Sequence, residues 1–460
     1  MRVPELEEAI YQRYIVPTKR SRTERVGLEF ELPIVNQRNK PVDFQVVHRL
    51  TDDFIRQFGF ASFQRDDDGY IYSALNNQTG DGLSYDCSYN TLEFSFGVEE
   101  DMNRLDERFR QYYSFVQDRL QREHHTLTGM GINPHYRINQ NIPVRSERYR
   151  MLLHHLCSYP LYGQAIPFHD HPNFGLFSCA SQIQVDVQED MLVETLNTFT
   201  KLEPLKTLLL ANSPWGDHYE TLCSRDNFWK NSLHGLNRHN VDMYDLQFQS
   251  VDEIIEYIKG MSIYCVERDG KYINFRPTKL EEYFTSDKVT GEYFDGNTYQ
   301  SISFRPEQSD LHYLRSFKFE DLTFRGTVEF RSVCEQPVSE IMASGALHAG
   351  LMENLHALTQ KLESDYVIYH KGYTPSELRY LFDQRELPAM FDRSELSALL
   401  LDILRIAEDG LHKRGFGEER FLQPLYPRAE QLLSPAGQMA DGLLFGGKTV
   451  DDYIVEFGRL

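Results

Sequence analysis

The sequence lacks the features that identify membrane, secreted and disulfide-stabilised proteins. Its six cysteines are scattered, with no Cys-x-x-Cys pair and no metal-ligand spacing, which is typical of reduced thiols in the cytosol. No apolar run comes near the roughly 18 residues of a membrane span. The first residues also lack the basic and apolar regions of a signal peptide. We therefore expect a soluble, cytoplasmic protein.

Basic clusters are missing as well. The formal net charge is -21 at pH 7, and no basic block or stripe occurs anywhere in the chain. This composition argues against nucleic acid or an anionic membrane surface as a partner. An anionic substrate would need local arginines or a metal ion to hold it against the overall field of the protein.

The short motifs of several enzyme classes are also absent. No GxSxG, HExxH or GxGxxG sequence occurs in a supporting context. Gly446–Thr449 lies close to the C-terminus and is not interpreted as part of a phosphate-binding loop. Phe168–His171 contains two histidines, which either bind a metal or form structural hydrogen bonds; we favour the second interpretation.

The composition is that of a folded protein with a large core. The 460 residues could form one large domain or two or three of ordinary size. Hydrophobic residues make up 41% of the chain and aromatic residues 13%, so disorder is not expected.

The pattern along the chain predicts an α+β fold. Residues 1–100 are expected to alternate strands with turns, and residues 251–330 to return to strands. An amphipathic helix is expected over Leu105–Leu120, and another over Asp190–Leu210 with an interruption at Pro204.

The chain is expected to become almost wholly helical after Pro337. Three segments offer an N-cap residue followed by good helix-starting residues. They are Thr374–Glu377, Asp392–Glu395 and Ser434–Pro435. This part of the chain is therefore predicted to pack as a helical region on the strands and helices before it.

Four segments alternate apolar and polar residues with the period of a half-buried antiparallel strand. They are Val26–Leu32, Leu92–Phe96, Ser181–Val187 and Leu322–Arg331. The last is the most informative, because Glu329 and Arg331 stand two residues apart and therefore point in the same direction.

Two interpretations of these polar faces are open. Any antiparallel sheet with one face in water alternates in this way, and the chain is acidic throughout. The alternative is one active-site surface, because the faces carry Glu, Gln and Asp with one Arg and no Lys. Converging carboxylates would cost roughly 4 kcal/mol per pair at about 4 Å, unless divalent cations removed the repulsion. Oxygen ligands favour Mg²⁺ or Mn²⁺, and an adjacent Arg indicates phosphoryl transfer from a nucleotide.

The chain resembles the plant and proteobacterial type of glutamate–cysteine ligase, in the glutamine-synthetase-like superfamily of carboxylate–amine ligases. The matching segments are weak singly, but they occur in the expected order over roughly residues 25 to 440. They are Gly27–Glu31, Ser84–Asp86 with Leu92–Ser95, Gly131–Pro134, Gln182–Asp186, Ala211–Pro214 with Arg225 and Trp229, Arg325–Arg331, Gly410–Gly415, Phe421–Leu422 and Ser434–Ala436. Asp86 stands where the family usually has Glu, and Gln184 replaces a shorter Asn, so a shifted amino-acid specificity is one implication.

The resemblance implies a glutamine-synthetase-like fold. Such a fold has a curved antiparallel sheet with a polar concave active-site face, flanked by helices. Residues 1–373 would form the catalytic domain, and residues 374–460 a helical C-terminal region packed on it.

The resemblance also implies a reaction and a set of site residues. ATP would phosphorylate the γ-carboxylate of glutamate with Mg²⁺ (or Mn²⁺) as cofactor, and the amine of cysteine would then attack. The metal ligands would be Glu29, Glu31, Glu93, Gln182 and Glu329. Arg331 would stabilise the transferring phosphoryl group beside Glu329, and Arg225, Gln184 and Asn212 would contact the substrates.

Two further possibilities stay open. The chain could be a relative that joins glutamate, or a different amino acid, to another amine. It could also be a non-catalytic binding protein, which the retained carboxylates disfavour. The partners expected are small molecules, namely amino acids and ATP, and the sequence gives no indication of the oligomeric state.

Overall fold

The fold is organised around one large antiparallel sheet. The computed structural model describes residues 3–244 and 246–460. Within these residues the largest sheet has nine strands in the order β14-β15-β7-β1-β5-β4-β3-β2, and β6 pairs with the end of β1. The strands are β1 (Val26–Asn36), β2 (Ser62–Arg65), β3 (Ile71–Leu75), β4 (Gly82–Tyr85), β5 (Thr91–Ser95), β6 (His125–Leu127), β7 (Ser181–Asp186), β14 (Glu320–Leu322) and β15 (Thr327–Phe330). The predicted combination of helices with antiparallel strands is confirmed.

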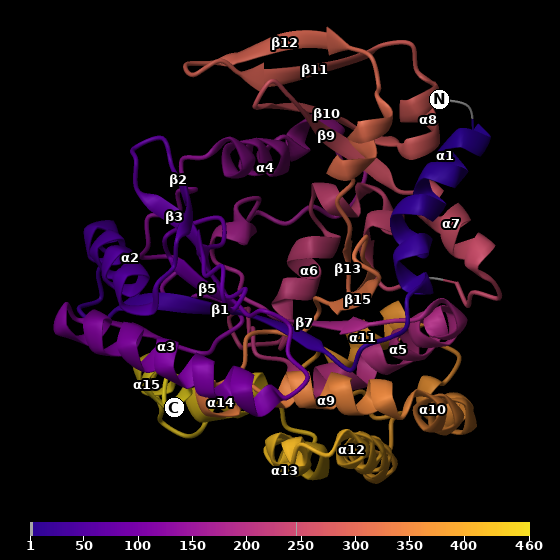
Figure 1. The fold of residues 1–460 in the computed structure, drawn as a ribbon. Coiled ribbons are helices and arrows are strands. Elements are labelled where there is room, and N and C mark those ends of the chain that lie inside the picture. The colour runs from indigo at the N-terminus through magenta and orange to yellow at the C-terminus, as the bar shows by residue number, and fades with distance from the viewer. Residues whose placement is uncertain (1–2, 245) are drawn as a thin grey trace.

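The apolar face of this sheet packs on helices. Phe30 of β1 meets Phe109 of α3 (Met102–Arg122) edge-to-face, with ring centroids 5.4 Å apart. Gly345 of α9 (Ala343–Glu353) lies against Leu28, where an added Cβ would come within 2.9 Å of the leucine side chain. Figure 1 shows α3 and α9 beneath the sheet, so the polar sides of β1, β5, β7 and β15 face away from these helices. The predicted strands at β1, β5 and β7 and the predicted helix at α3 are confirmed.

The segment Leu322–Arg331 forms a hairpin, and its prediction as a single strand is wrong. Leu322 ends β14 and pairs with Val328 of β15. Gly326 lies between them with a φ of +76°, a left-handed conformation that favours glycine. An added Cβ at Gly326 would come within 2.6 Å of the Pro17 carbonyl oxygen. Glycine at this turn therefore accommodates both the left-handed backbone and the close approach of an N-terminal segment, which the alternation pattern does not reveal.

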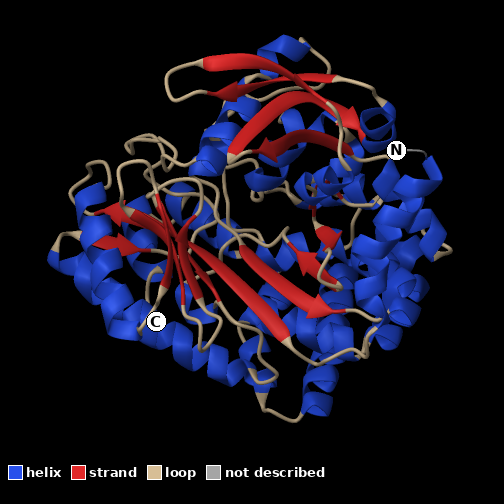
Figure 2. Cartoon of the chain, turned by 45° about the horizontal axis from the view of Figure 1, so that its top comes forward, coloured by secondary structure: helices blue, strands red, loops and turns tan. Residues whose placement is uncertain are grey.

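Two smaller sheets accompany the large one, and the four-stranded one lies above it (Figure 2). The first has the order β12-β11-β10-β9, and the second pairs β13 with β8 in parallel. Their bounds are β8 (Val241–Asp242), β9 (Ser262–Arg268), β10 (Lys271–Lys279), β11 (Val289–Phe294), β12 (Tyr299–Phe304) and β13 (Phe317–Lys318). Helix α4 (Glu147–Cys157) joins this layer, because the ring of His155 stacks on Tyr264 of β9 with centroids 3.9 Å apart.

Several helices occur where the sequence pattern predicts strands. The first hundred residues contain α1 (Val3–Ile10) and α2 (Phe44–Phe58), and residues 251–259 form α7 (Val251–Lys259) instead of a strand. The side chain of Asp43 caps α2 and that of Ser250 caps α7. These two capping residues are the sequence signals that would have predicted helices in place of strands. The other helices before residue 340 are α4, α5 (Glu189–Leu210), α6 (Ser224–Lys230) and α8 (Leu280–Thr285).

Helix α5 runs through Pro204 without the predicted interruption. Proline removes one backbone donor and usually breaks a helix. Here residues 202–210 are all buried, so packing on both sides of the proline outweighs the missing hydrogen bond. Tertiary contacts therefore decide the length of α5.

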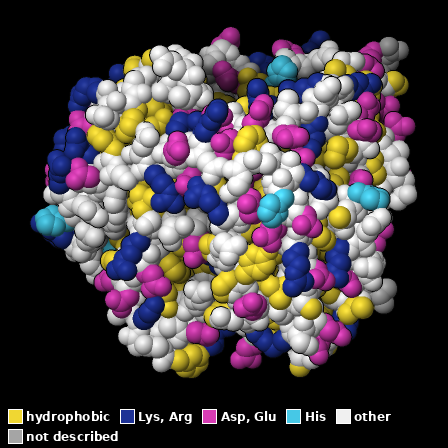
Figure 3. Space-filling model, turned by 60° about the horizontal axis from the view of Figure 1, so that its bottom comes forward, with side chains coloured by type: hydrophobic (Ala, Val, Ile, Leu, Met, Phe, Trp, Pro, Cys, Tyr) yellow, Lys and Arg dark blue, Asp and Glu magenta, His cyan; other side chains and the backbone are white. Residues whose placement is uncertain are grey.

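The chain after Pro337 is almost wholly helical, as predicted. Thr374 and Glu377 form a complete capping box at α11, and Asp392 and Ser434 cap α12 and α14 through their side chains. The helices are α9, α10 (Leu355–His370), α11 (Pro375–Phe382), α12 (Arg393–Arg414), α13 (Leu425–Gln431), α14 (Pro435–Leu444) and α15 (Val450–Phe457). Acidic and basic side chains alternate over the underside of the molecule (Figure 3). No helix in the described part of the chain has the length and apolarity needed to cross a bilayer.

Candidate active site

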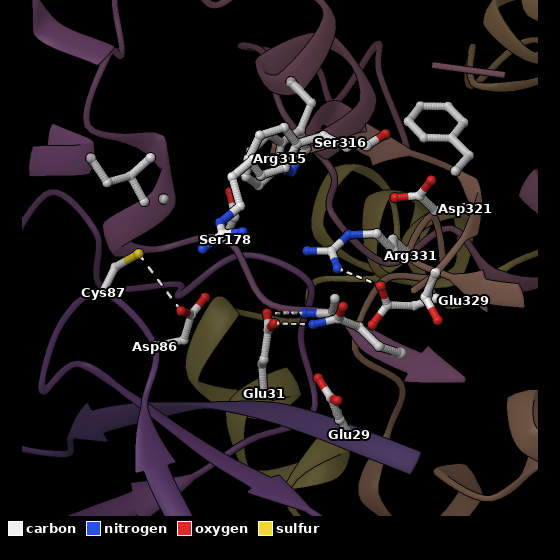
Figure 4. A pocket seen from close by; sticks show the side chains of 18 of the residues that line it. Glu29, Glu31, Asp86, Cys87, Ser178, Arg315, Ser316, Asp321, Glu329 and Arg331 are labelled. Atoms are coloured by element: carbon white, nitrogen blue, oxygen red, sulfur yellow. Dashed lines mark hydrogen bonds and ion pairs between the residues drawn. The ribbon is translucent and has the colours of Figure 1, made fainter. Parts of the chain in front are cut away.

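The polar side of the large sheet forms the floor of a cavity of about 590 Å³. Strand register brings the predicted residues together. Glu31 of β1 stands opposite Glu93 of β5, and Glu29 stands opposite Gln182 of β7. On the far side of β7, Gln184 stands opposite Glu329 of β15. Figure 4 shows Glu29, Glu31, Glu329 and Arg331 around one space.

Three carboxylates meet at one end of this floor. One oxygen from each of Glu31, Asp86 and Glu93 lies within 4.8 Å of the other two. Glu31 accepts hydrogen bonds from the Ala180 backbone N–H at 2.6 Å and from Nε2 of Gln182 at 2.8 Å. The separation suits a shared divalent cation, because each oxygen could reach the same ion. Asp86 was not among the predicted metal ligands, although the family resemblance had included its segment.

A second group of polar side chains centres on Gln184. Its Nε2 donates to Glu29 at 3.3 Å and to Glu329 at 3.0 Å, so it bridges two carboxylates. Nη1 of Arg331 donates to the other oxygen of Glu329 at 2.8 Å. Arg331 therefore lies beside the carboxylates with its guanidinium held in place and facing the cavity (Figure 4).

Burial and crowding make these carboxyl groups hold their protons more tightly than usual. Burial, with the neighbouring charge of Glu329, raises the pKa of Glu29 to about 7. Burial, with the charge of Asp86, raises the pKa of Glu31 to about 8. The pKa values of Asp86 and Glu93 are raised as well, burial again being the main cause. A divalent cation is the natural means of holding such a group ionised at neutral pH.

The predicted metal ligands fit a hard cation. Glu29, Glu31, Glu93, Gln182 and Glu329 all line the cavity. The Oε1 atom of Gln182 is buried and has no hydrogen-bond partner, which leaves it available as a neutral oxygen ligand. An all-oxygen donor set of this kind selects Mg²⁺ or Mn²⁺ over zinc.

The predicted substrate-binding residues fall in three different environments. Arg225 of α6 lines the cavity, and its Nε atom is buried without a hydrogen-bond partner. Gln184 is engaged between the two glutamates and does not line the cavity. Asn212 lies away from the cavity, where its Nδ2 donates to the carbonyls of Gly129 at 2.8 Å and Glu335 at 2.7 Å. Asn212 therefore stabilises the backbone at its position.

Four arginines that the sequence analysis did not select also line the cavity. They are Arg13, Arg148, Arg315 and Arg325. Arg13 and Arg148 lie in helical turns and Arg315 in a loop, none of which has the strand pattern. Arg325 lies in the turn of the hairpin. The only sequence signal was the position of Arg325 within the segment matching the family. The acidic chain thus concentrates basic side chains around this cavity.

A buried ionic network borders the cavity, which one of its members, Asp226, lines. Arg379 of α11 donates to Asp226 at 2.6 Å and to Glu203 at 2.9 Å, and Lys206 lies 2.5 Å from Glu203. All four residues are buried. Nη2 of Arg379 also lies 3.5 Å from the carbonyl of Ser332, which follows Arg331 in the chain. A residue of the C-terminal helices thus contacts the segment that carries Arg331.

Two other sequence patterns do not form catalytic sites. His169 has Nε2 2.8 Å from the Phe228 carbonyl and accepts the His171 backbone N–H at Nδ1, so neither ring nitrogen is available to a metal. The second pattern is the segment Gly446–Thr449. With Gly442, the residues Gly447, Lys448 and Thr449 have the spacing of a phosphate-binding loop. Gly442 lies inside α14 and Thr449 caps α15, so the strand–loop–helix context of that motif is absent.

Residues 25–436 match the model of the family described as Glutamate-cysteine ligase family 2 (GCS2). The match covers most of the chain, including every predicted site residue. This chain belongs to the GCS2 family. The resemblance noted in the sequence is therefore confirmed, and the family is one of ligases.

Individual relatives are distant. The chain is 21% identical to the chloroplastic glutamate–cysteine ligase of Solanum lycopersicum over 279 residues, which is 59% of this chain and 50% of that one. It is also 21% identical to the chloroplastic glutamate–cysteine ligase of Arabidopsis thaliana over 322 residues, or 68% of this chain and 56% of that one. The chain thus spans only about half the length of these relatives.

Two solved structures also resemble this GCS2 chain. A bifunctional glutathione synthetase from Pasteurella multocida aligns with a TM-score of 0.43 and 11% identity, covering 99% of this chain and 54% of that one. A glutamate–cysteine ligase from Francisella tularensis in complex with AMP aligns with a TM-score of 0.42 and 10% identity, covering 96% and 88% of the two chains.

Proposed function

We propose that this chain is an ATP- and Mg²⁺-dependent ligase that joins the γ-carboxylate of glutamate to the amine of cysteine. One observation carries the proposal. In a chain of the GCS2 family, the side chains of Glu29, Glu31, Glu93, Glu329 and Arg331 line a single cavity. A carboxylate needs activation before an amine can displace its oxygen, and a phosphoryl group from ATP supplies a leaving group.

In the proposed reaction, the carboxylates and Gln182 hold the metal ions and Arg331 binds the transferring phosphoryl group. Glu29, Glu31, Glu93, Gln182 and Glu329 would hold the metal ions, and Asp86 joins them because it shares a group with Glu31 and Glu93. Bound Mg²⁺ would neutralise charge on the phosphate and the carboxylate, so that two anions can approach. Arg331 offers a planar guanidinium to the transferring phosphoryl group, fixed in direction by Glu329.

The proposed reaction has two bond-forming steps in this cavity. The γ-carboxylate oxygen forms a bond to phosphorus as ADP leaves, and the acceptor nitrogen then forms a bond to the acyl carbon as phosphate leaves. Arg225 lines the same cavity with an unpaired buried Nε and would bind an anionic part of a substrate. No described residue is assigned as the base that takes the proton from the amine.

The proposal includes the finer features of the fold. The polar side of the sheet would be the concave face of a glutamine-synthetase-like catalytic domain over residues 1–373. The helices of residues 374–460 would form the region packed on it, and α12 packs against α9 in keeping with this division. A cytoplasmic location remains part of the proposal.

A ligase with a different acceptor or amino acid is the second candidate. Asp86 favours it, because the family usually has the longer Glu at this position and Asp86 lies directly in the carboxylate group. The shorter side chain changes the space available near Glu31 and Glu93.

A screen of ADP release tests both candidates. The protein is incubated with ATP, Mg²⁺ and pairs of amino acids, each pair containing one carboxylate donor and one amine acceptor. We expect ADP release to require glutamate and to be fastest with cysteine. Faster release with another pair supports the second candidate, and absence of release with every pair refutes a ligase function.

A further inference from the structure

The N-terminal segment Tyr11–Arg22 forms part of the cavity although it precedes the region that matches the family, which begins at residue 25. Residues Tyr11–Ile15 form a short π-helix, an uncommon geometry that often occurs at functional sites. Arg13 and Tyr14 of this turn both line the cavity. The family match therefore leaves one wall of the cavity unassigned.

Several contacts fix this segment to the hairpin that carries Glu329. The Pro17 carbonyl lies against Gly326, where an added Cβ would come within 2.6 Å of it. Nη2 of Arg20 donates to the carbonyl of Arg325 at 3.1 Å and to Asp186 of β7 at 2.9 Å. The segment thus has a defined position relative to β7 and β15.

Arg13 is the cavity-lining arginine of this segment, and its side chain also hydrogen-bonds to the neighbouring Tyr14. Its Nε atom is buried without a hydrogen-bond partner, and it forms no ion pair with any carboxylate that the structure describes. Its guanidinium lies 4.6 Å from the ring centre of Phe324, and that of Arg325 lies 5.2 Å from the same ring. The ring of Phe324 therefore contacts the guanidinium groups of two arginines that line the cavity.

We infer that Arg13 binds an oxyanion of a substrate in this cavity and so determines affinity for that substrate. The inference rests on the proposed ligase function, which brings two kinds of oxyanion to the site: the phosphates of a nucleotide and the carboxylate of an amino acid. A buried, unpaired guanidinium nitrogen next to a cavity is stabilised by an anionic ligand. Arg325 lies against the same Phe324 ring but is paired with Glu329, 3.8 Å away, so Arg13 is the arginine of the two without a carboxylate partner among the described residues.

Binding measurements on Arg13→Gln identify which oxyanion is bound. Calorimetric titrations with ADP and with glutamate, each in the presence of Mg²⁺, are compared between the wild type and the variant. We expect a loss of about 10- to 100-fold in affinity for one of the two ligands, the range for removing one or two hydrogen bonds to a charged group. The other ligand should change less than about twofold, and Arg13→Lys should show an intermediate loss, because lysine retains the charge without the planar fork.

Lys19→Gln is the matched control, because it removes one positive charge from the same segment at a side chain outside the cavity. Weakening of ADP binding alone assigns a phosphate to Arg13, and weakening of glutamate binding alone assigns a carboxylate. Changes no larger than those of Lys19→Gln overturn the inference, as does equal weakening of both ligands, which indicates a distorted cavity.

The two proposals fail in different ways. A wild type that binds ADP or glutamate but releases no ADP in the substrate screen refutes the ligase function, while the affinities still test Arg13. A wild type that binds neither ligand refutes both. If Arg13→Gln fails to fold, Arg13→Lys alone must show the selective loss.

Discussion

Replacing Arg379 with methionine tests how the buried network supports the cavity. Methionine fills most of the volume but removes the charge that pairs with Asp226 at 2.6 Å and Glu203 at 2.9 Å. Glu203 keeps Lys206 at 2.5 Å, whereas the remaining side-chain partner of Asp226 among the described residues is the thiol of Cys223 at 3.5 Å. The variant therefore leaves one carboxylate buried without a cation.

The expected loss of folding stability follows from the unpaired carboxylate of Asp226. Breaking a buried ion pair by removing one partner costs about 3–5 kcal/mol, a large part of the about 5–15 kcal/mol that stabilises a typical domain. Arg145→Met is the control, because Arg145 pairs with Asp68 at the surface, where the two side chains are 63% and 46% exposed. Exposed pairs of this kind contribute about 0–1 kcal/mol.

Urea unfolding followed by tryptophan fluorescence measures both variants. The two tryptophans report on this region, because Trp229 lies in α6, which carries Asp226, and Trp215 packs on Phe228 of the same helix. Asp226→Asn combined with Arg379→Met should recover part of the loss, since no uncompensated carboxylate then remains. A loss for Arg379→Met no greater than that of Arg145→Met, with an unchanged slope of the transition, would refute the reasoning.

Three further outcomes are expected. Glu329→Gln and Arg331→Ala should each abolish ADP formation in a coupled assay while the circular dichroism spectrum stays unchanged; near-normal turnover would remove both residues from the proposed mechanism. Saturating Mg²⁺ should raise the midpoint temperature of thermal unfolding of the wild type, because a hundredfold excess over Kd stabilises the folded protein by about 2.7 kcal/mol. Glu31→Gln or Asp86→Asn should reduce this rise. A rise in both variants equal to that of the wild type would contradict the assignment. Burial, with the charge of Glu203, raises the pKa of Glu320 to about 8, above its value in the unfolded chain. The contribution of its protonated form is therefore complete below the ordinary carboxyl pKa of 4.5 and is lost as the pH rises from there to about 8, by at most about 1.4 kcal/mol per pH unit. Glu320→Gln should flatten this part of a stability profile measured by urea unfolding, and an unchanged slope would contradict the shift.

The sequence by itself determined the strands of the floor and the residue types on them. The alternation of Glu29 and Glu31 with Leu28 and Phe30 is a property of neighbouring residues, because a strand points successive side chains to opposite faces. The helix starts at Thr374 and Ser434 are equally local, since a cap needs only residues within one turn. The order of short motifs along the chain was sufficient to indicate the family.

Only the tertiary structure decided which residues share the cavity. Strand register places Glu31 opposite Glu93, and a shift by one residue would point either side chain into the apolar layer. The turn that brings Asp86 beside them, and the N-terminal segment that supplies Arg13, have no periodic pattern that sequence reasoning can use. Asn212 was predicted to contact a substrate, and the tertiary structure instead places it outside the cavity. Its buried hydrogen bonds to the Gly129 and Glu335 carbonyls join segments far apart in the chain.

The hairpin at Leu322–Arg331 combines both cases. Its sequence determined that Glu329 and Arg331 point to the same side, and the structure has them 2.8 Å apart. The glycine at the reversal, Gly326, leaves room for the Pro17 carbonyl, more than 300 residues earlier in the chain. Local alternation fixes the direction of a side chain, whereas long-range packing fixes where its strand begins and what lies across from it.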